Sequence, residues 1–159
     1  MPNSSEVQFG GSGITLDCYL DIENRTSYGA RILEFGSGDV STKALSPRNH
    51  LISVEHNTHW VNKYPTADYV HVNLKAGFYD IKALNRLGLP FWDYDLVLFD
   101  GPVGSEARMG FLSMLNLLHD SATYVINNTD RAMEQVVASV YADRFKKRII
   151  NRGEYSVLV

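Results

Sequence analysis

The chain has 159 residues, of which 45% are hydrophobic and 21% are charged, and its formal net charge is −3. A chain of this size buries a sizeable core, so we expect one domain over 1–159. The slightly acidic balance provides no electrostatic footprint for nucleic acid, and no apolar run approaches the roughly 20 residues that cross a bilayer. The single cysteine, Cys18, allows no intrachain disulfide, and we therefore expect a cytoplasmic protein without nucleic-acid or membrane partners.

The predicted elements start with a helix over 14–26, where apolar residues recur at helical spacing, and we assign 1–28 to an N-terminal capping segment. From there, short apolar runs alternate with amphipathic stretches. The runs are rich in Val, Ile, Leu and Phe, which is typical of strands buried on both faces of a sheet. The predicted strands are 31–35, 51–55, 68–72, 95–99 and 123–127. The predicted helices lie near 41–46, 58–64, 79–87, 106–119 and 130–144.

This alternation of strands and helices predicts right-handed βαβ crossovers and a doubly wound, parallel α/β fold. The end of the chain departs from it, because 146–150 and 155–159 are predicted as two strands joined by a tight turn. We therefore expect a mostly parallel seven-stranded sheet that ends in an antiparallel hairpin, inside a three-layer α/β/α sandwich.

The stretch FGSGDVST at 35–42 occupies the first β-to-α turn, which is the usual ligand contact in an open α/β sheet. Gly36 and Gly38 permit positive φ and a close approach of the backbone to a ligand. A nucleoside triphosphate is disfavoured, because the pattern GxxxxGK[ST] is absent and Lys43 follows the Ser-Thr pair instead of preceding it.

A dinucleotide is a weak match to this turn, because Ser41 stands where a third glycine is expected, although Glu55 closes the second strand. Two acids beside the turn oppose a pyrophosphate: Glu34 ends the first strand and Asp39 lies inside the turn. Like charges about 4 Å apart repel by about 4 kcal/mol at an effective dielectric of about 20. A cationic ligand would instead be attracted by the two acids. The acids therefore favour S-adenosylmethionine, which carries a sulfonium and an ammonium. Glu55 can accept hydrogen bonds from its two ribose hydroxyls.

At these positions the chain resembles the class I S-adenosylmethionine-dependent methyltransferases, whose first motif is an acid, any residue and then GxG. The resemblance covers nearly the whole chain through the order of its motifs, since Glu55, Asn73 and Asp100 close the second, third and fourth strands. It implies a Rossmann-like domain that binds S-adenosylmethionine, with Glu34 and the Gly36/Gly38 backbone at the methionine end, Glu55 at the ribose and Asn73 at the adenine. The cofactor-binding residues that it implies are Glu34, Gly36, Ser37, Gly38, Glu55, Asn73 and Asp100.

Asp100 emerges from a fully apolar strand, and Gly101, Pro102 and Gly104 then shape a tight turn. The first and fourth strands are neighbours at the switch point of such a sheet, so Asp100 is expected beside the glycine turn. We predict that Asp100 is the catalytic residue that orients or deprotonates the acceptor, with His56 as the second candidate. A simple Asx-turn is the alternative interpretation of Asp100.

The fifth strand delivers Asn127 and Asn128 to the same edge of the sheet. This region is similar to the catechol-type O-methyltransferases, in which an aspartate after strand four joins an Asp-Asn pair after strand five to bind magnesium. Asn127-Asn128 carries one charge fewer, and magnesium prefers anionic oxygen ligands, so we predict no metal. His56, His59 and His71 are not expected to form a metal site, because alternation scatters their side chains over different faces.

The stretch from LVLFDGP to NNTDR is also similar to the methyltransferases that act on plant glucuronoxylan, which share a strand-end Asp followed by a small residue and Pro. This resemblance implies O-methyl transfer to a small hydroxylated or sugar acceptor. Arg108 would then either pair with an acidic acceptor or be solvated at the start of a helix.

Two other functions stay open at this point. An NAD-dependent oxidoreductase would ordinarily need a Tyr/Lys proton relay, and the pattern YxxxK is absent. A non-catalytic module that binds S-adenosylmethionine or only a partner is favoured by the near absence of insertions that could form an acceptor pocket. A homodimer or another chain would complete such a pocket, unless the acceptor is large and external.

Overall fold

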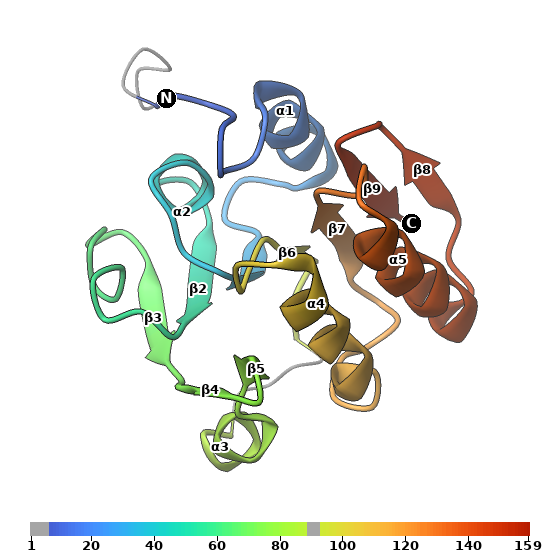
Figure 1. Ribbon diagram of the computed structural model, residues 1–159. Coiled ribbons are helices and arrows are strands. Elements are labelled where there is room, and N and C mark those ends of the chain that lie inside the picture. Colours follow the sequence, from blue (N-terminus) through green and yellow to red (C-terminus); the bar gives the residue numbers. More distant parts are fainter. Residues whose placement is uncertain (1–6, 89–92) are drawn as a thin grey trace.

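The computed structural model describes residues 7–88 and 93–159, so the first six residues of the predicted capping segment lie outside it. A seven-stranded sheet in the order β3-β2-β1-β6-β7-β9-β8 carries helices on both faces (Figure 1). The elements, in chain order, are α1 (Leu16–Arg25), β1 (Arg31–Phe35), α2 (Ser41–Leu45), β2 (His50–Glu55), β3 (Asp68–His71), β4 (Leu74–Lys75), β5 (Phe78–Tyr79), α3 (Ile81–Arg86), β6 (Leu96–Phe99), α4 (Ser105–Arg108), the 3₁₀ helix η2 (Met109–Met114), β7 (Thr123–Asn127), α5 (Ala132–Phe145), β8 (Ile149–Asn151) and β9 (Tyr155–Leu158).

The sheet is mostly parallel, as predicted. β1 pairs in parallel with both β2 and β6, β2 pairs with β3, and β6 pairs with β7. The exception is β9, which lies antiparallel between β7 and β8. All residues of β6 are buried, which agrees with the apolar run that predicted this strand. The predicted fold class is confirmed, including the terminal hairpin.

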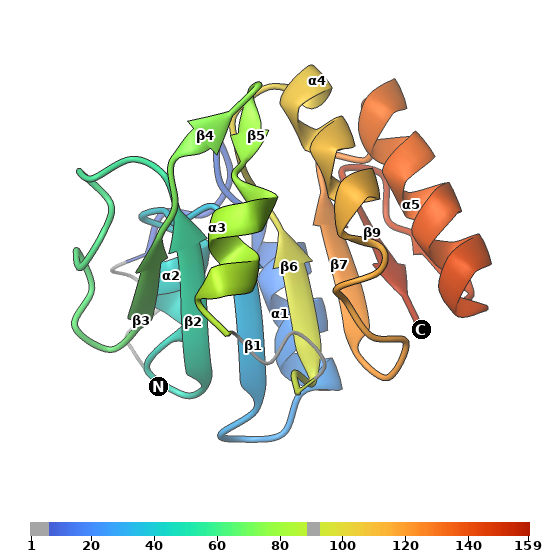
Figure 2. The same cartoon turned by 90° about the horizontal axis from the view of Figure 1, so that it is seen from below.

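The helices form one layer on each face of the sheet. Figure 2 shows α3, α4 and α5 in front of the sheet and α1 and α2 behind it. Side chains of β1 alternate between the two resulting cores: Ile32 packs with Ile22 of α1, and Leu33 packs in the cluster that holds Phe99 and Tyr141. Within the described ranges, no helix combines the length and apolar character that a membrane span needs.

The helix predicted near 58–64 is wrong, because this segment forms turns. The Asn57 side chain accepts a hydrogen bond from the His59 amide at 3.0 Å, and Asn62 has a positive φ of 62°. Asparagine side chains of this kind offer the backbone a local partner that competes with the helical one. The loop between β2 and β3 is therefore shaped by its own asparagines.

The single helix predicted over 106–119 is also wrong, since α4 ends after one turn and continues as η2. In η2, the backbone of Gly110 lies directly against the Phe78 ring, where a Cβ would come within 2.1 Å of Cγ. The β4–β5 hairpin that carries Phe78 was not predicted. Its turn is made by Ala76 and Gly77, which have φ values of 52° and 82°.

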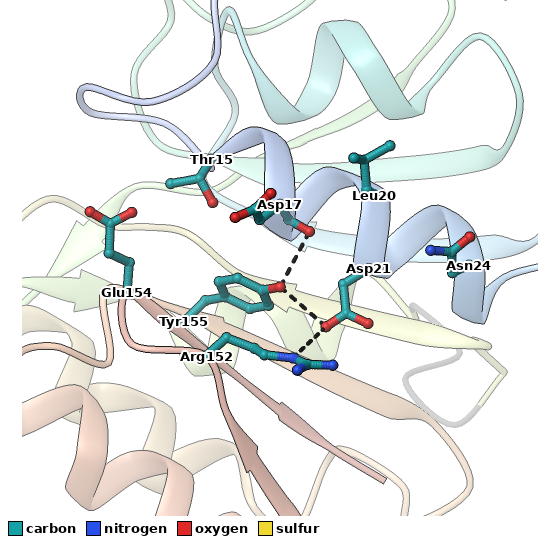
Figure 3. A pocket seen from close by; sticks show the side chains of 8 residues that line it. All are labelled: Thr15, Asp17, Leu20, Asp21, Asn24, Arg152, Glu154 and Tyr155. Carbon is teal, nitrogen blue, oxygen red and sulfur yellow. Dashed lines mark hydrogen bonds and ion pairs between the residues drawn. The ribbon is translucent and has the colours of Figure 1, made fainter.

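The capping helix α1 is tied to the terminal hairpin across a surface cavity of about 380 Å³ (Figure 3). Thr15 caps the helix by accepting a hydrogen bond from the Cys18 amide at 3.2 Å. The Tyr155 hydroxyl donates to Asp21 at 3.2 Å, and Arg152 pairs with the same carboxylate at 3.3 Å. These contacts hold α1 against the sheet.

The carboxyl ends of β1 and β6 touch through two glycines. The Asp100 amide donates to the Phe35 carbonyl at 2.9 Å, which continues the pairing of β1 with β6 that the sequence predicted. Gly36 follows with a φ of 93°, and a Cβ there would lie 2.6 Å from the N and Cα atoms of Gly101. Any side chain at Gly36 would push the two strand ends apart.

Replacing Gly36 by alanine is expected to lower the free energy of unfolding by at least about 2 kcal/mol, because it adds a left-handed φ to a backbone clash. Gly38→Ala is the matched control, since a Cβ there meets no atom within 4 Å and no left-handed φ is present. Its free energy of unfolding should change by about 0.5 kcal/mol or less. Urea denaturation of both variants measures the difference, and equal losses would show that the glycine contact is not a constraint on the fold.

Candidate functional site

A cavity of about 280 Å³ opens at the carboxyl ends of β1, β2 and β6. This is where the first β-to-α turn of an open α/β sheet meets its ligand. The structure brings together the glycine turn, the end of β2 and the loop after β6. The predicted site residues among its lining are Gly36, Ser37, Gly38, Glu55, His56 and Asp100.

Glu55 ends β2 and holds the glycine turn through its carboxylate. It is 3% exposed, and its Oε2 accepts the Ser37 amide at 2.8 Å. Its Oε1 accepts the amides of His56 and Asn57, both at 2.7 Å. A carboxylate offers about four acceptor positions, so three backbone donors leave about one for a ligand. We therefore expect Glu55 to accept a hydrogen bond from one ribose hydroxyl rather than from two.

Glu34 lies behind the glycine turn rather than in the cavity. It is fully buried and accepts hydrogen bonds from the hydroxyls of Ser41 and Thr42, the latter at 2.6 Å. The Thr42 hydroxyl in turn accepts the Gly38 amide at 3.0 Å, which links Glu34 to the turn. Burial raises the pKa of Glu34 to about 7, against the opposing effect of these hydrogen bonds. Glu34 thus positions the turn and does not reach the cavity, which differs from its predicted contact with the methionine end.

Asn73 does not contribute to the cavity lining. Its side chain is exposed, and its backbone carbonyl accepts the Asp80 amide at 3.0 Å. The assignment of Asn73 to an adenine stays a prediction. His59 and His71 are exposed as well, and among the described residues no group of three or more His, Cys, Asp and Glu side chains could hold a metal ion.

Asp100 presents its carboxylate to the cavity with a side chain that is only 7% exposed. The Asn127 amide donates to its Oδ1 at 2.7 Å, and the Arg108 guanidinium lies 4.0 Å away. Burial raises the pKa of Asp100 to about 6, although Asn127 and Arg108 both favour the charged form. A carboxylate with this pKa is ionised at neutral pH and close enough to it to accept a proton.

Arg108 is not solvated, so that expectation is wrong, and it does not belong to the lining of the cavity. The side chain is buried because it ties together three segments that meet beneath the cavity. It donates to the backbone carbonyls of Asp100 at 2.8 Å and of Pro102 at 3.2 Å. It also reaches the Asn128 side chain at 2.7 Å and lies 3.8 Å from Glu134. Its positive charge therefore favours the ionised form of Asp100 from the side away from the cavity.

Sequence reasoning missed two aromatic residues of the lining, Trp60 and Tyr79. Trp60 was assigned to a helix, but the loop turns it toward the cavity and Lys63 lies 4.0 Å over its ring. Lys63 also pairs with Asp39 of the glycine turn at 2.9 Å, which joins the two walls. Tyr79 sits in the unpredicted β4–β5 hairpin, and no motif marks it.

Comparison with known proteins places the fold. No protein-family model matches the chain, and no curated protein matches its sequence. Among solved structures, a TehB-like SAM-dependent methyltransferase from Corynebacterium glutamicum is 17% identical with a TM-score of 0.60, over 92% of this chain and 88% of that one. The C-terminal domain of precorrin-6Y C5,15-methyltransferase from Rhodobacter capsulatus is 13% identical with a TM-score of 0.58, over 99% and 94%.

Fibrillarin from Aeropyrum pernix, which was solved with natively bound S-adenosyl-L-methionine, is 15% identical with a TM-score of 0.57, over 90% of this chain and 72% of that one. Likeness at such identities concerns the fold. The chain has the class I S-adenosylmethionine-dependent methyltransferase fold, as its motifs predicted. Its antiparallel β9 also distinguishes this sheet from the dinucleotide-binding order of six strands.

The pKa of Asp100 makes a prediction about stability. In the folded protein this pKa is about 6, against 3.8 for the free side chain, so the unfolded chain binds fewer protons between these values. Stability from this residue is therefore highest below about pH 4 and is lost as the pH rises through about 6. Over the whole pH range this pKa difference corresponds to roughly 3 kcal/mol of stability. Asp100→Asn should remove this pH dependence, while the new amide oxygen can still accept the hydrogen bond from Asn127.

Urea denaturation of both proteins at about pH 4.5 and about pH 7.5 measures the effect. The variant should gain stability over the parent at the higher pH, relative to the lower one. If the two proteins respond equally to pH, the carboxyl group of Asp100 is not the buried acid that the geometry indicates.

Proposed function

We propose that the protein binds S-adenosylmethionine in the cavity at the carboxyl ends of β1, β2 and β6 and transfers its methyl group to an oxygen acceptor. The observation that carries this proposal is the charge of the lining. Asp39, Glu55 and Asp100 line the cavity, whereas Lys63, which pairs with Asp39, and Arg108, which lies near Asp100, are not part of its lining. A cationic sulfonium is favoured there, whereas a pyrophosphate would meet like charges.

The shape of the glycine turn supports the same ligand. The position of a Gly38 Cβ is open space, so the backbone can approach a bound molecule there. Ser37 and Gly38 are fixed from behind by Glu55 and Thr42, so the turn is formed before any ligand enters. Glu55 keeps about one acceptor position for a hydroxyl of the ligand. A preformed turn of this kind lowers the entropic cost of binding.

S-adenosylmethionine, when bound, supplies a methyl group that is already activated on sulfur. The work left for the protein is to orient the acceptor and to take up its proton. Asp100 is the residue that we assign to both tasks, because its carboxylate lines the cavity and has a pKa of about 6. His56 is the second candidate, with its Nδ1 3.0 Å from Glu55.

The charge of the lining also restricts the acceptor. Arg108 is occupied by backbone and side-chain oxygens beneath the cavity, so it does not offer a cation to a carboxylate group. A neutral hydroxylated molecule, including an uncharged sugar, suits the site better than an acidic acceptor. Val103 at the rim of the cavity is 91% exposed, which leaves the acceptor side open. A large acceptor or a second chain, such as a homodimer partner, would cover it.

Calorimetry with S-adenosylhomocysteine and NAD in parallel tests the ligand. We expect S-adenosylhomocysteine to bind and Glu55→Ala to weaken it at least tenfold, because hydrogen bonds to a charged group contribute about 1.5–3 kcal/mol and the turn loses its anchor. Glu154→Ala is the matched control, since it removes the same charge from the cavity between α1 and the terminal hairpin. NAD binding without S-adenosylhomocysteine binding would favour the oxidoreductase instead.

Asp100→Asn is expected to reduce methyl transfer by about 10²–10⁴-fold, the usual effect of losing a general base. The affinity for S-adenosylhomocysteine should change far less, because the glycine turn and Glu55 remain. In the parent protein the rate should fall below about pH 6, where Asp100 becomes protonated. A variant that binds the cofactor and transfers methyl groups at the normal rate would remove Asp100 from the chemistry.

A further inference from the structure

Tyr79 carries a hydroxyl group that no described residue satisfies. The residue is 1% exposed, lines the cavity, and has no hydrogen-bond partner for its Oη within the described ranges. A buried hydroxyl without a partner costs free energy in a folded protein, so it calls for an explanation. A ligand in the cavity is the missing partner that the position of Tyr79 allows.

The hydroxyl lies beside the loop that carries Asp100, and the ring lies beside His56. Its Oη faces Gly101, where a Cβ would come within 3.0 Å, and Gly101 directly follows Asp100. The Tyr79 ring packs edge-on against His56, with the ring centroids 6.3 Å apart. The Phe35 and Phe78 rings pack against Tyr79 on its other sides, so the phenol is held in place.

The surroundings of Tyr79 fix its role as a donor. Burial raises its pKa well above the usual value, and the neighbouring charges of Glu55, Glu34 and Asp100 raise it further. Arg108 acts in the opposite direction but is outweighed. The phenol therefore keeps its proton at neutral pH and cannot serve as a base. Its O–H group is therefore always a hydrogen-bond donor, and this donor needs an atom with a lone pair to accept it.

We propose that Tyr79 donates its hydrogen bond to the acceptor oxygen that Asp100 deprotonates, and that this pair selects a hydroxyl over an amine. The inference rests on the proposed function. A hydroxyl oxygen has two lone pairs: one accepts from Tyr79, and the other forms the new bond to the methyl carbon. As that bond forms, the carbon–sulfur bond breaks with its electron pair on sulfur, and the hydroxyl proton passes to Asp100.

A neutral amine fails this arrangement. Its nitrogen has one lone pair, which is needed for the attack on the methyl carbon. An amine N–H can donate to the Tyr79 oxygen, but the O–H donor of Tyr79 would stay buried without an acceptor. Such an unpaired group is how a polar site rejects a ligand that lacks the matching atom. Tyr79 is thus a positioning residue that determines specificity for oxygen.

The first experiment detects the hydrogen bond without turnover. Protein labelled with ¹³C at the tyrosine Cζ atoms is saturated with S-adenosylhomocysteine, and Tyr79→Phe assigns the Tyr79 signal by its disappearance. Phenol and methyl glucoside serve as hydroxyl probes, and at least one of them should shift this signal. Tyr94→Phe is the matched control, because Tyr94 is also buried and its hydroxyl has no hydrogen-bond partner among residues 7–88 and 93–159, but it lies outside the cavity lining. The Tyr94 signal should not move.

The second experiment measures preference. Transfer of a radioactive methyl group is compared for the pairs phenol and aniline, and glucose and glucosamine, in the parent, Tyr79→Phe and Tyr94→Phe proteins. The ratio of oxygen to nitrogen transfer should fall at least fivefold in Tyr79→Phe and stay constant in Tyr94→Phe. This ratio does not respond to a general loss of folded protein.

The outcomes separate the two proposals. Failure of the parent protein to bind S-adenosylhomocysteine overturns the proposed function itself. If the cofactor product binds but no hydroxyl probe moves the Tyr79 signal, the role of Tyr79 is overturned while the function stands. The same holds if the parent transfers methyl groups to amines as well as to hydroxyls, or to no hydroxyl in the panel, or if Tyr79→Phe leaves the ratio unchanged.

Discussion

The site depends on the contact between the backbones of Gly36 and Gly101. Two neighbouring strands, β1 and β6, end at the same level, and their chains diverge only after the glycines have touched. Because neither position carries a side chain, the turn after β1 and the loop after β6 share one wall. Ser37 and Gly38 on one side and Asp100 on the other therefore open into the same cavity. A doubly wound sheet always brings these strand ends together, and the glycines make the approach close.

The second constraint is electrostatic. The region around the cavity contains several carboxylates at different depths, and each is stabilised by a different set of hydrogen-bond donors. Glu55 accepts three backbone amides, Glu34 accepts two hydroxyls, and Asp100 has one amide donor with a guanidinium nearby. The number of donors decreases toward the β6 end of the cavity, where a carboxylate that can still take up a proton is useful. These acids of the same charge thus differ in how many donors hold them.

The strands of the main sheet could be predicted from the sequence because strands buried on both faces leave continuous apolar runs, as in LVLF at 96–99. The glycine turn and the acids that follow β1, β2 and β6 could be located for the same reason, since each comes directly after such a run. The direction in which each acidic side chain points was harder to predict. Glu34 and Glu55 both lie near strand ends, but only Glu55 lines the cavity, because Glu34 is hydrogen-bonded by Ser41 and Thr42 behind the turn. Trp60 and Tyr79 depend on loop conformations set by Asn62 and by Ala76-Gly77, whose positive φ values leave no periodic signal.

Arg108 gives the region beneath Asp100 a cation that is part of the polypeptide. The guanidinium touches oxygens from the ends of β6 and β7, including the Asn128 side chain. A bound ion exchanges with the medium, so its occupancy follows concentration and competing ligands. A covalently attached charge is present in every molecule from the moment of folding. The positive charge of Arg108 beside Asp100 is therefore encoded in the gene and does not depend on the ionic composition of the surroundings.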